Sequence, residues 1–97
     1  MAEGSPYTSQ ELNRIRWQCR RGMKELDLLI EQFFEDSFNA LTAEQQKTFV
    51  RMLEESDLSL FRWLLRGESP SDPSFAELIE IMRSRYARRI QGSGSDE

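Results

Sequence analysis

Few side chains in this 97-residue sequence could carry out chemistry. The chain has no His, and its single cysteine, Cys19, has no second thiol with which to form a disulfide. A metal site and nucleophilic catalysis with a His base are therefore unexpected. Adjacent acids such as Glu35 and Asp36 could be considered as a general acid and base, but neighbours on a helix point in different directions. We expect no catalytic residues, no bound metal and no enzyme.

Other candidate groups have simpler interpretations. Cys19 lies on an apolar stripe, where a lone cysteine is usually a small buried residue rather than a reactive thiol. The glycine-rich stretch 92–95 lacks the strand-loop-helix context in which backbone amides hold a phosphate. We therefore expect no cofactor to be bound stably by this chain. Trp63 is typical of core packing, whereas Trp17 could be either a core or an interface residue.

The charge distribution is more informative than the formal net charge of −4. A negative total argues against nucleic acid as a partner, because the phosphate backbone attracts a positive surface. The segment from Glu11 to Lys24 holds five basic residues and one acid, whereas Glu25 to Asp57 holds nine acids. We expect a molecule whose two sides differ in charge.

No segment predicts insertion into a membrane or export. No stretch approaches the roughly 20 apolar residues that span a bilayer. The beginning of the sequence has neither a basic region followed by an apolar run nor an Arg-rich amphipathic segment. These features favour the cytoplasm of a bacterium, with the matrix of an organelle as the alternative if a targeting segment has already been removed.

Apolar residues at three- and four-residue spacing predict five helices and no strand. The first is expected from about Ser9 to Arg21, with a capping box at Thr8 and Glu11 and with Gly22 at its end. The second carries most of the core, with Leu26, Leu29, Ile30, Phe33 and Phe34. The third follows a capping box at Thr42. The fourth is capped by Ser56 or Asp57, carries Leu58 among its apolar residues and ends at Gly67. The fifth begins at Asp72-Pro73.

This pattern predicts an all-α protein, a compact five-helix bundle with short loops and disordered termini. We expect a single helical domain over residues 9–90. A flexible N-terminus should precede it over residues 1–8, and an acidic Gly/Ser tail should follow it over residues 91–97.

The segment from Arg20 to Glu25 is the best candidate for a binding surface. A structural interpretation is available, because basic residues suit the end of a helix, glycine caps it and an acid suits the start of the next helix. However, Gly22 also leaves bare backbone at a corner between a cation and an acid, and another protein's backbone could approach it closely. We favour a docking surface.

The residues from Arg14 to Asp27 resemble the FAD assembly factor family of succinate dehydrogenase, whose hallmark is RGxxE. In this sequence the hallmark falls on Arg21, Gly22 and Glu25. The resemblance extends from about Leu12 to Ile81 and includes Phe33-Phe34-Glu35 and the aromatic segment around Trp63.

This resemblance implies a helical protein that promotes covalent attachment of FAD to a histidine of its partner. The implied partner is the flavoprotein subunit of succinate dehydrogenase or, in some bacteria, of fumarate reductase, so FAD is the partner's cofactor. We expect the free protein to be a monomer. The implied binding residues are Arg21, Gly22 and Glu25, supported by Arg14, Trp17, Arg20, Met23 and Asp27. The same resemblance leaves an alternative function, that of an antitoxin that binds a small membrane toxin or its target.

Overall fold

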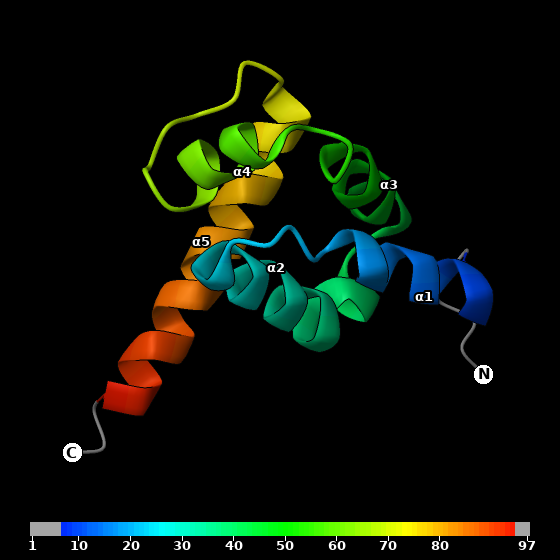
Figure 1. Ribbon diagram of the computed structural model, residues 1–97, viewed down its shortest axis with the longest axis horizontal. Coiled ribbons are helices and arrows are strands. Elements are labelled where there is room, and N and C mark those ends of the chain that lie inside the picture. The colour runs from blue at the N-terminus through cyan, green and yellow to red at the C-terminus, as the bar shows by residue number, and fades with distance from the viewer. Residues whose placement is uncertain (1–6, 95–97) are drawn as a thin grey trace.

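The protein is an all-α bundle, as the sequence predicts (Figure 1). The computed structural model describes residues 7–94, with side chains described up to residue 87. Five α-helices and one short 3-10 turn make up this part of the chain, which contains no strand. They are α1 (Ser9–Gln18), α2 (Lys24–Ser37), η1 (Phe38–Ala40), α3 (Ala43–Met52), α4 (Asp57–Leu64) and α5 (Pro73–Gly94).

Short-range hydrogen bonds fix where the helices begin. The Thr8 hydroxyl accepts from the amide of Glu11 at 3.1 Å, and the Glu11 carboxylate accepts from the amide of Thr8 at 2.9 Å. Thr42 and Gln45 form the same reciprocal pair at the start of α3. These pairs satisfy amides that have no partner inside the helix. The predicted caps of α4 and α5 are also present, provided by Ser56 and Asp72.

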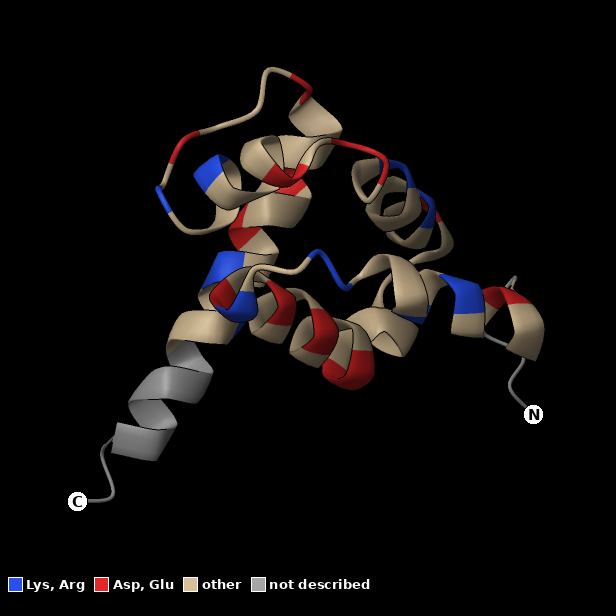
Figure 2. Ribbon diagram, in the orientation of Figure 1, with Lys and Arg blue, Asp and Glu red and all other residues tan. Residues whose placement is uncertain are grey.

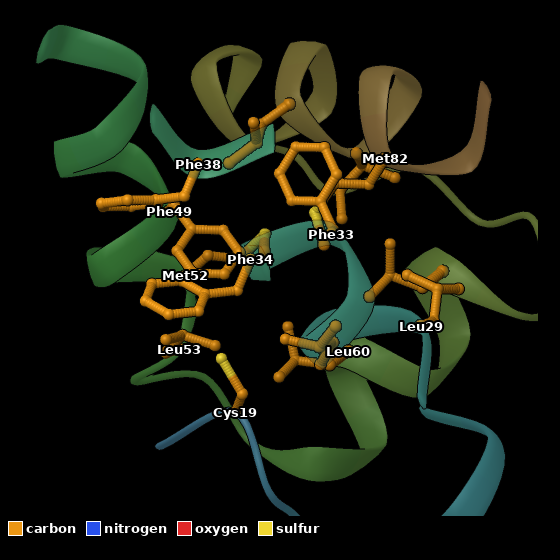
Figure 3. Close-up of a cluster of buried hydrophobic side chains, with 14 of the residues drawn as sticks. Cys19, Leu29, Phe33, Phe34, Phe38, Phe49, Met52, Leu53, Leu60 and Met82 are labelled. Carbon is orange, nitrogen blue, oxygen red and sulfur yellow. The ribbon is translucent and has the colours of Figure 1, made fainter. Parts of the chain in front are cut away.

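The core is built around α2, against which aromatic side chains from neighbouring elements pack (Figure 3). Phe34 and Phe38 lie 5.0 Å apart between ring centroids, and Phe38 and Phe49 lie 5.5 Å apart. Such pairs contribute about 0.5–1.5 kcal/mol beyond their buried area. Buried apolar residues of α5, including Leu78 and Met82, close the other side.

Phe38 is a core residue that the helical pattern does not reveal. It belongs to η1, which follows α2 directly and bends the chain so that the ring turns inward. The buried Gln46 side chain donates to the Phe38 carbonyl at 2.8 Å and anchors this turn to α3. The turn therefore joins α2 and α3 by both packing and a buried hydrogen bond.

Leu58, one of the apolar residues of the predicted fourth helix, is 57% exposed. The buried residues of α4 are Leu60 and Leu64, one turn apart. Leu58 precedes Leu60 by two positions, which places it on the opposite side of a helix with 3.6 residues per turn. Trp63 is half-buried, and its ring lies 5.9 Å from that of Phe75, consistent with the predicted packing role.

The first helix ends at Gln18, so the predicted extension to Arg21 is wrong. Cys19 is the residue at its C-cap, and Gly22 lies beyond it. The amide of Arg21 donates to the carboxylate of Asp27 and is not available for a carbonyl one turn back in α1. A competing side-chain acceptor therefore ends the helix early.

The structure describes short segments on both sides of the predicted helical domain. Tyr7, predicted within a flexible N-terminus, packs its ring 5.9 Å from Phe38. Helix α5 continues to Gly94, into the segment 91–97 that the sequence predicts as a disordered tail. Residues 1–6 and 95–97 lie outside the described residues. Across the described part of the chain, no helix combines the length and apolar character needed to cross a membrane.

We predict that Phe38→Ala lowers the free energy of unfolding by about 3–5 kcal/mol, because it leaves a cavity between α2 and α3. Leu58→Ala is the matched control and should change it by less than about 0.5 kcal/mol, since Leu58 is exposed. Urea unfolding followed by circular dichroism measures both. Equal losses in the two variants would contradict the place given to Phe38 in the core.

Candidate functional site

The candidate site lies on the linker between α1 and α2, residues 19–23, which we call the Gly22 corner (Figure 1). Gly22 is exposed and has φ +87°, a conformation that L side chains rarely adopt. A Cβ atom placed on it would meet no atom within 4 Å. The backbone conformation therefore requires glycine here, and the space above it is open to another molecule.

Arg21 points into the fold and is only 14% exposed along its side chain. Its Nη1 atom donates to Asp57 Oδ1 at 3.1 Å and approaches the Glu55 carbonyl at 3.5 Å, while Nη2 donates to the carbonyl of Leu53. These acceptors all belong to the end of α3, the loop that follows it and the first residue of α4. Arg21 thus fastens the Gly22 corner to the α3–α4 connection, a role that the sequence did not indicate.

Asp27 holds the same corner from the side of α2. Its Oδ1 atom accepts from the amide of Arg21 at 2.6 Å, and its Oδ2 atom accepts from the amide of Gly22 at 3.1 Å. Asp27 is half-buried, so the carboxylate faces its own linker. Arg21 and Asp27, which the sequence predicts as partner-binding residues, therefore both make contacts within the fold.

Besides Gly22 and Arg20, the predicted site residues that face solvent are Glu25, Arg14 and Trp17. Glu25 stands in the first turn of α2 and has no hydrogen-bond or ion-pair partner in the described part of the chain. Trp17 is 71% exposed, which decides between its two interpretations in favour of a surface residue. Tryptophan is enriched among the residues that contribute most to protein–protein binding, so an exposed one is typical of a protein-binding surface.

The other two predicted site residues have supporting positions. Arg20 is exposed and donates to Glu31 of α2 at 2.9 Å. Met23 is half-buried, packs against the core and occupies the N-cap of α2 without a side-chain capping bond. Together they fix how the corner enters α2.

Basic residues of α1 and the linker lie over the acidic helix α2, so the expected separation of charge is partly neutralised (Figure 2). Arg16 pairs with Glu35, and Arg20 pairs with Glu31. Exposed pairs of this kind contribute about 0–1 kcal/mol each. Because Arg20 is paired with Glu31, and Arg21 and Asp27 make contacts within the fold, Glu25 and Arg14 are the predicted site residues whose charges have no partner in the described part of the chain.

Cys19 is a core residue, as the sequence predicts. It is fully buried, and its thiol donates to the Ile15 carbonyl at 3.3 Å (Figure 3). Burial, together with the nearby carboxylate of Glu31, raises the pKa of the thiol to about 12. The nucleophilic thiolate is therefore scarce near neutral pH, and Cys19 is unsuited to covalent catalysis.

Comparison with known proteins gives a consistent result. The profile of a family described as the flavinator of succinate dehydrogenase matches residues 13–86. An FAD assembly factor SdhE from Vibrio vulnificus is 49% identical over 85 residues, which cover 88% of this chain and 99% of that protein. A protein of the same name from Yersinia pseudotuberculosis is 40% identical over 78% of this chain and 86% of its own length. Another, from Pectobacterium atrosepticum, is also 40% identical, over 79% of this chain and 88% of its own length.

We predict that Arg21→Ala lowers the free energy of unfolding by about 1–3 kcal/mol, because it leaves the carbonyls of Leu53 and Glu55 without their donor. Arg20→Ala removes a neighbouring exposed cation and should cost at most about 1 kcal/mol. Thermal and urea unfolding of the two variants provide the measurement. If Arg21→Ala were as stable as Arg20→Ala, the contacts of Arg21 would not hold the linker in solution.

Proposed function

This chain belongs to the family of flavinators of succinate dehydrogenase, and on that premise we propose that it binds the flavoprotein subunit of this enzyme. Binding promotes the covalent attachment of FAD to a histidine of that subunit. The same proposal extends to the flavoprotein subunit of fumarate reductase in bacteria that have one. Binding takes place in the cytoplasm, with this chain acting as a monomer.

The observation that carries the proposal is the combination of an open glycine and an unpaired acid at one corner. Gly22 is exposed with no atom within 4 Å of an added Cβ, and Glu25 follows it in the first turn of α2. A partner backbone can approach Gly22 closely, while Glu25 offers a carboxylate to a donor on the partner. Trp17 supplies an apolar surface large enough to anchor such a contact.

The sequence hallmark then contains two kinds of residue. Gly22 and Glu25 touch the partner, together with Trp17 and Arg14 from α1. Arg21 acts from inside the fold by holding the corner in place. Arg20 and Met23 support the corner at its edges.

Such a surface can assist flavinylation without a catalytic group of its own. Holding reactants in a productive arrangement can remove about 7–11 kcal/mol from an activation barrier. The reaction needs the FAD ring and the histidine of the flavoprotein subunit to be held together, and a bound helper can favour the arrangement of that subunit in which they meet. In this mechanism FAD stays with the flavoprotein subunit.

Deletion of the gene tests the function directly. We expect the succinate dehydrogenase flavoprotein subunit to lose its in-gel flavin fluorescence, and we expect the wild-type gene to restore it. An undiminished fluorescent band would exclude the assembly role. Affinity capture from lysate complements this test, because the antitoxin alternative predicts recovery of a small membrane protein or of a toxin's target in place of the flavoprotein subunit.

The close approach at Gly22 is tested by comparing Gly22→Arg with Gly22→Ala. Both variants force a side chain into a positive φ, which costs about 1–2 kcal/mol, so their melting temperatures should fall by similar amounts. Only the arginine adds bulk where the partner backbone lies. We expect Gly22→Arg to abolish capture of the flavoprotein subunit and Gly22→Ala to retain most of it.

If both variants lost stability and capture to the same extent, glycine would be needed at position 22 only for its backbone conformation. In that case the contact with the partner would have to lie elsewhere on the exposed surface of α1 and α2.

A further inference from the structure

The two carboxylate oxygens of Asp27 accept hydrogen bonds from two consecutive backbone amides. Oδ1 accepts from the amide of Arg21 at 2.6 Å, and Oδ2 accepts from the amide of Gly22 at 3.1 Å. Successive backbone N–H groups that converge on one anion form a concave anion site. Here the anion is supplied by the chain itself, from the first turn of α2.

The positive φ of Gly22 is part of this arrangement. Consecutive residues direct their amides to one side when a left-handed residue follows a right-handed or turn conformation. Gly22 has φ +87°, and a Cβ added to it would meet no atom within 4 Å, so steric crowding at this position does not impose the value. The Asp27 carboxylate stabilises this conformation by accepting hydrogen bonds from the Arg21 and Gly22 amides.

The corner is therefore held at two points. The Arg21 side chain fixes it to the α3–α4 connection, while the Asp27 carboxylate fixes the Arg21 and Gly22 peptides to α2. The first contact sets where the corner lies in the fold. The second sets the orientation of the peptide groups, and hence how Gly22 is presented relative to Glu25 two residues before Asp27.

We propose that Asp27 is a positioning residue for partner binding: it orders the Gly22 corner before the flavoprotein subunit arrives and does not itself touch that subunit. This inference rests on the proposed function and deepens it. A corner that samples its docking geometry only one-tenth of the time binds about tenfold more weakly, because the apparent dissociation constant scales inversely with the competent fraction. Asp27 keeps that fraction near one.

The experiment uses the purified full-length chain, the FAD-loaded flavoprotein subunit not yet flavinylated, and the rate of covalent flavinylation as the assembly factor is titrated. We expect Asp27→Asn and Asp27→Ala to raise the half-saturating concentration about tenfold and to leave the rate at saturation within about twofold. Glu77→Gln is the matched control, because it removes one exposed acid from α5 and changes the net charge as Asp27→Asn does. It should behave as the wild type.

Amide hydrogen exchange supplies a readout that is independent of flavinylation. In both Asp27 variants the amides of Arg21 and Gly22 should lose protection, while amides in the middle of α2 and α5 keep theirs. Retained protection at Arg21 and Gly22 would overturn the inference. So would lost protection with an unchanged half-saturating concentration.

A double-mutant cycle separates positioning from direct contact. If Asp27 acts through the corner, Asp27→Asn added to Arg21→Ala, which removes the other attachment of the corner, should weaken binding by less than the product of the two single effects. Multiplicative effects would mean that Asp27 acts independently of the corner and would overturn the inference. If the wild-type chain itself failed to stimulate flavinylation, the proposed function would fall, while the exchange experiment would still test whether Asp27 orders the corner.

Discussion

The guanidinium of Arg21 joins two connections of the chain that are 32 to 36 residues apart in sequence. The α1–α2 linker and the α3–α4 connection contain backbone groups that no helix satisfies. Arg21 has five N–H donors in a rigid fork, which lets one side chain serve several acceptors in different directions. The other contacts of α1 with the bundle are the packing of Leu12, Ile15 and Cys19, the Arg16 guanidinium over the Phe34 ring, and an exposed ion pair.

This constraint explains how a linker in so small a protein can hold a defined conformation. Linkers are usually the most mobile parts of a fold, and ordering one on binding weakens the complex. In this chain the ordering occurs during folding, through Arg21 on one side and Asp27 on the other. Gly22 and Glu25 are then displayed on a fixed backbone, as a preorganised site requires.

Under the proposed function, the segment with Arg21, Gly22 and Glu25 combines residues that support the linker with residues that contact the partner. Its arginine is mostly buried and its glutamate is exposed, although both are charged residues within one short segment. A hallmark of this kind shows that residues are needed together, but it does not show that each one touches the partner. The division of roles follows from burial and hydrogen bonding, and these depend on elements that are distant in sequence.

The sequence alone determined most of the helical framework, because the interactions that set it are local. Capping residues act within three positions, as at Thr8, Thr42 and Ser56, and apolar spacing places the buried face of α2. It also identified the corner and the need for glycine there. Only the tertiary structure decided that Arg21 turns inward, because its acceptors come from another part of the chain, and that Trp17 stays outside, because no neighbouring helix covers that face of α1. The end of α1 likewise depended on Asp27, whose carboxylate captures amides that a local pattern assigns to the helix.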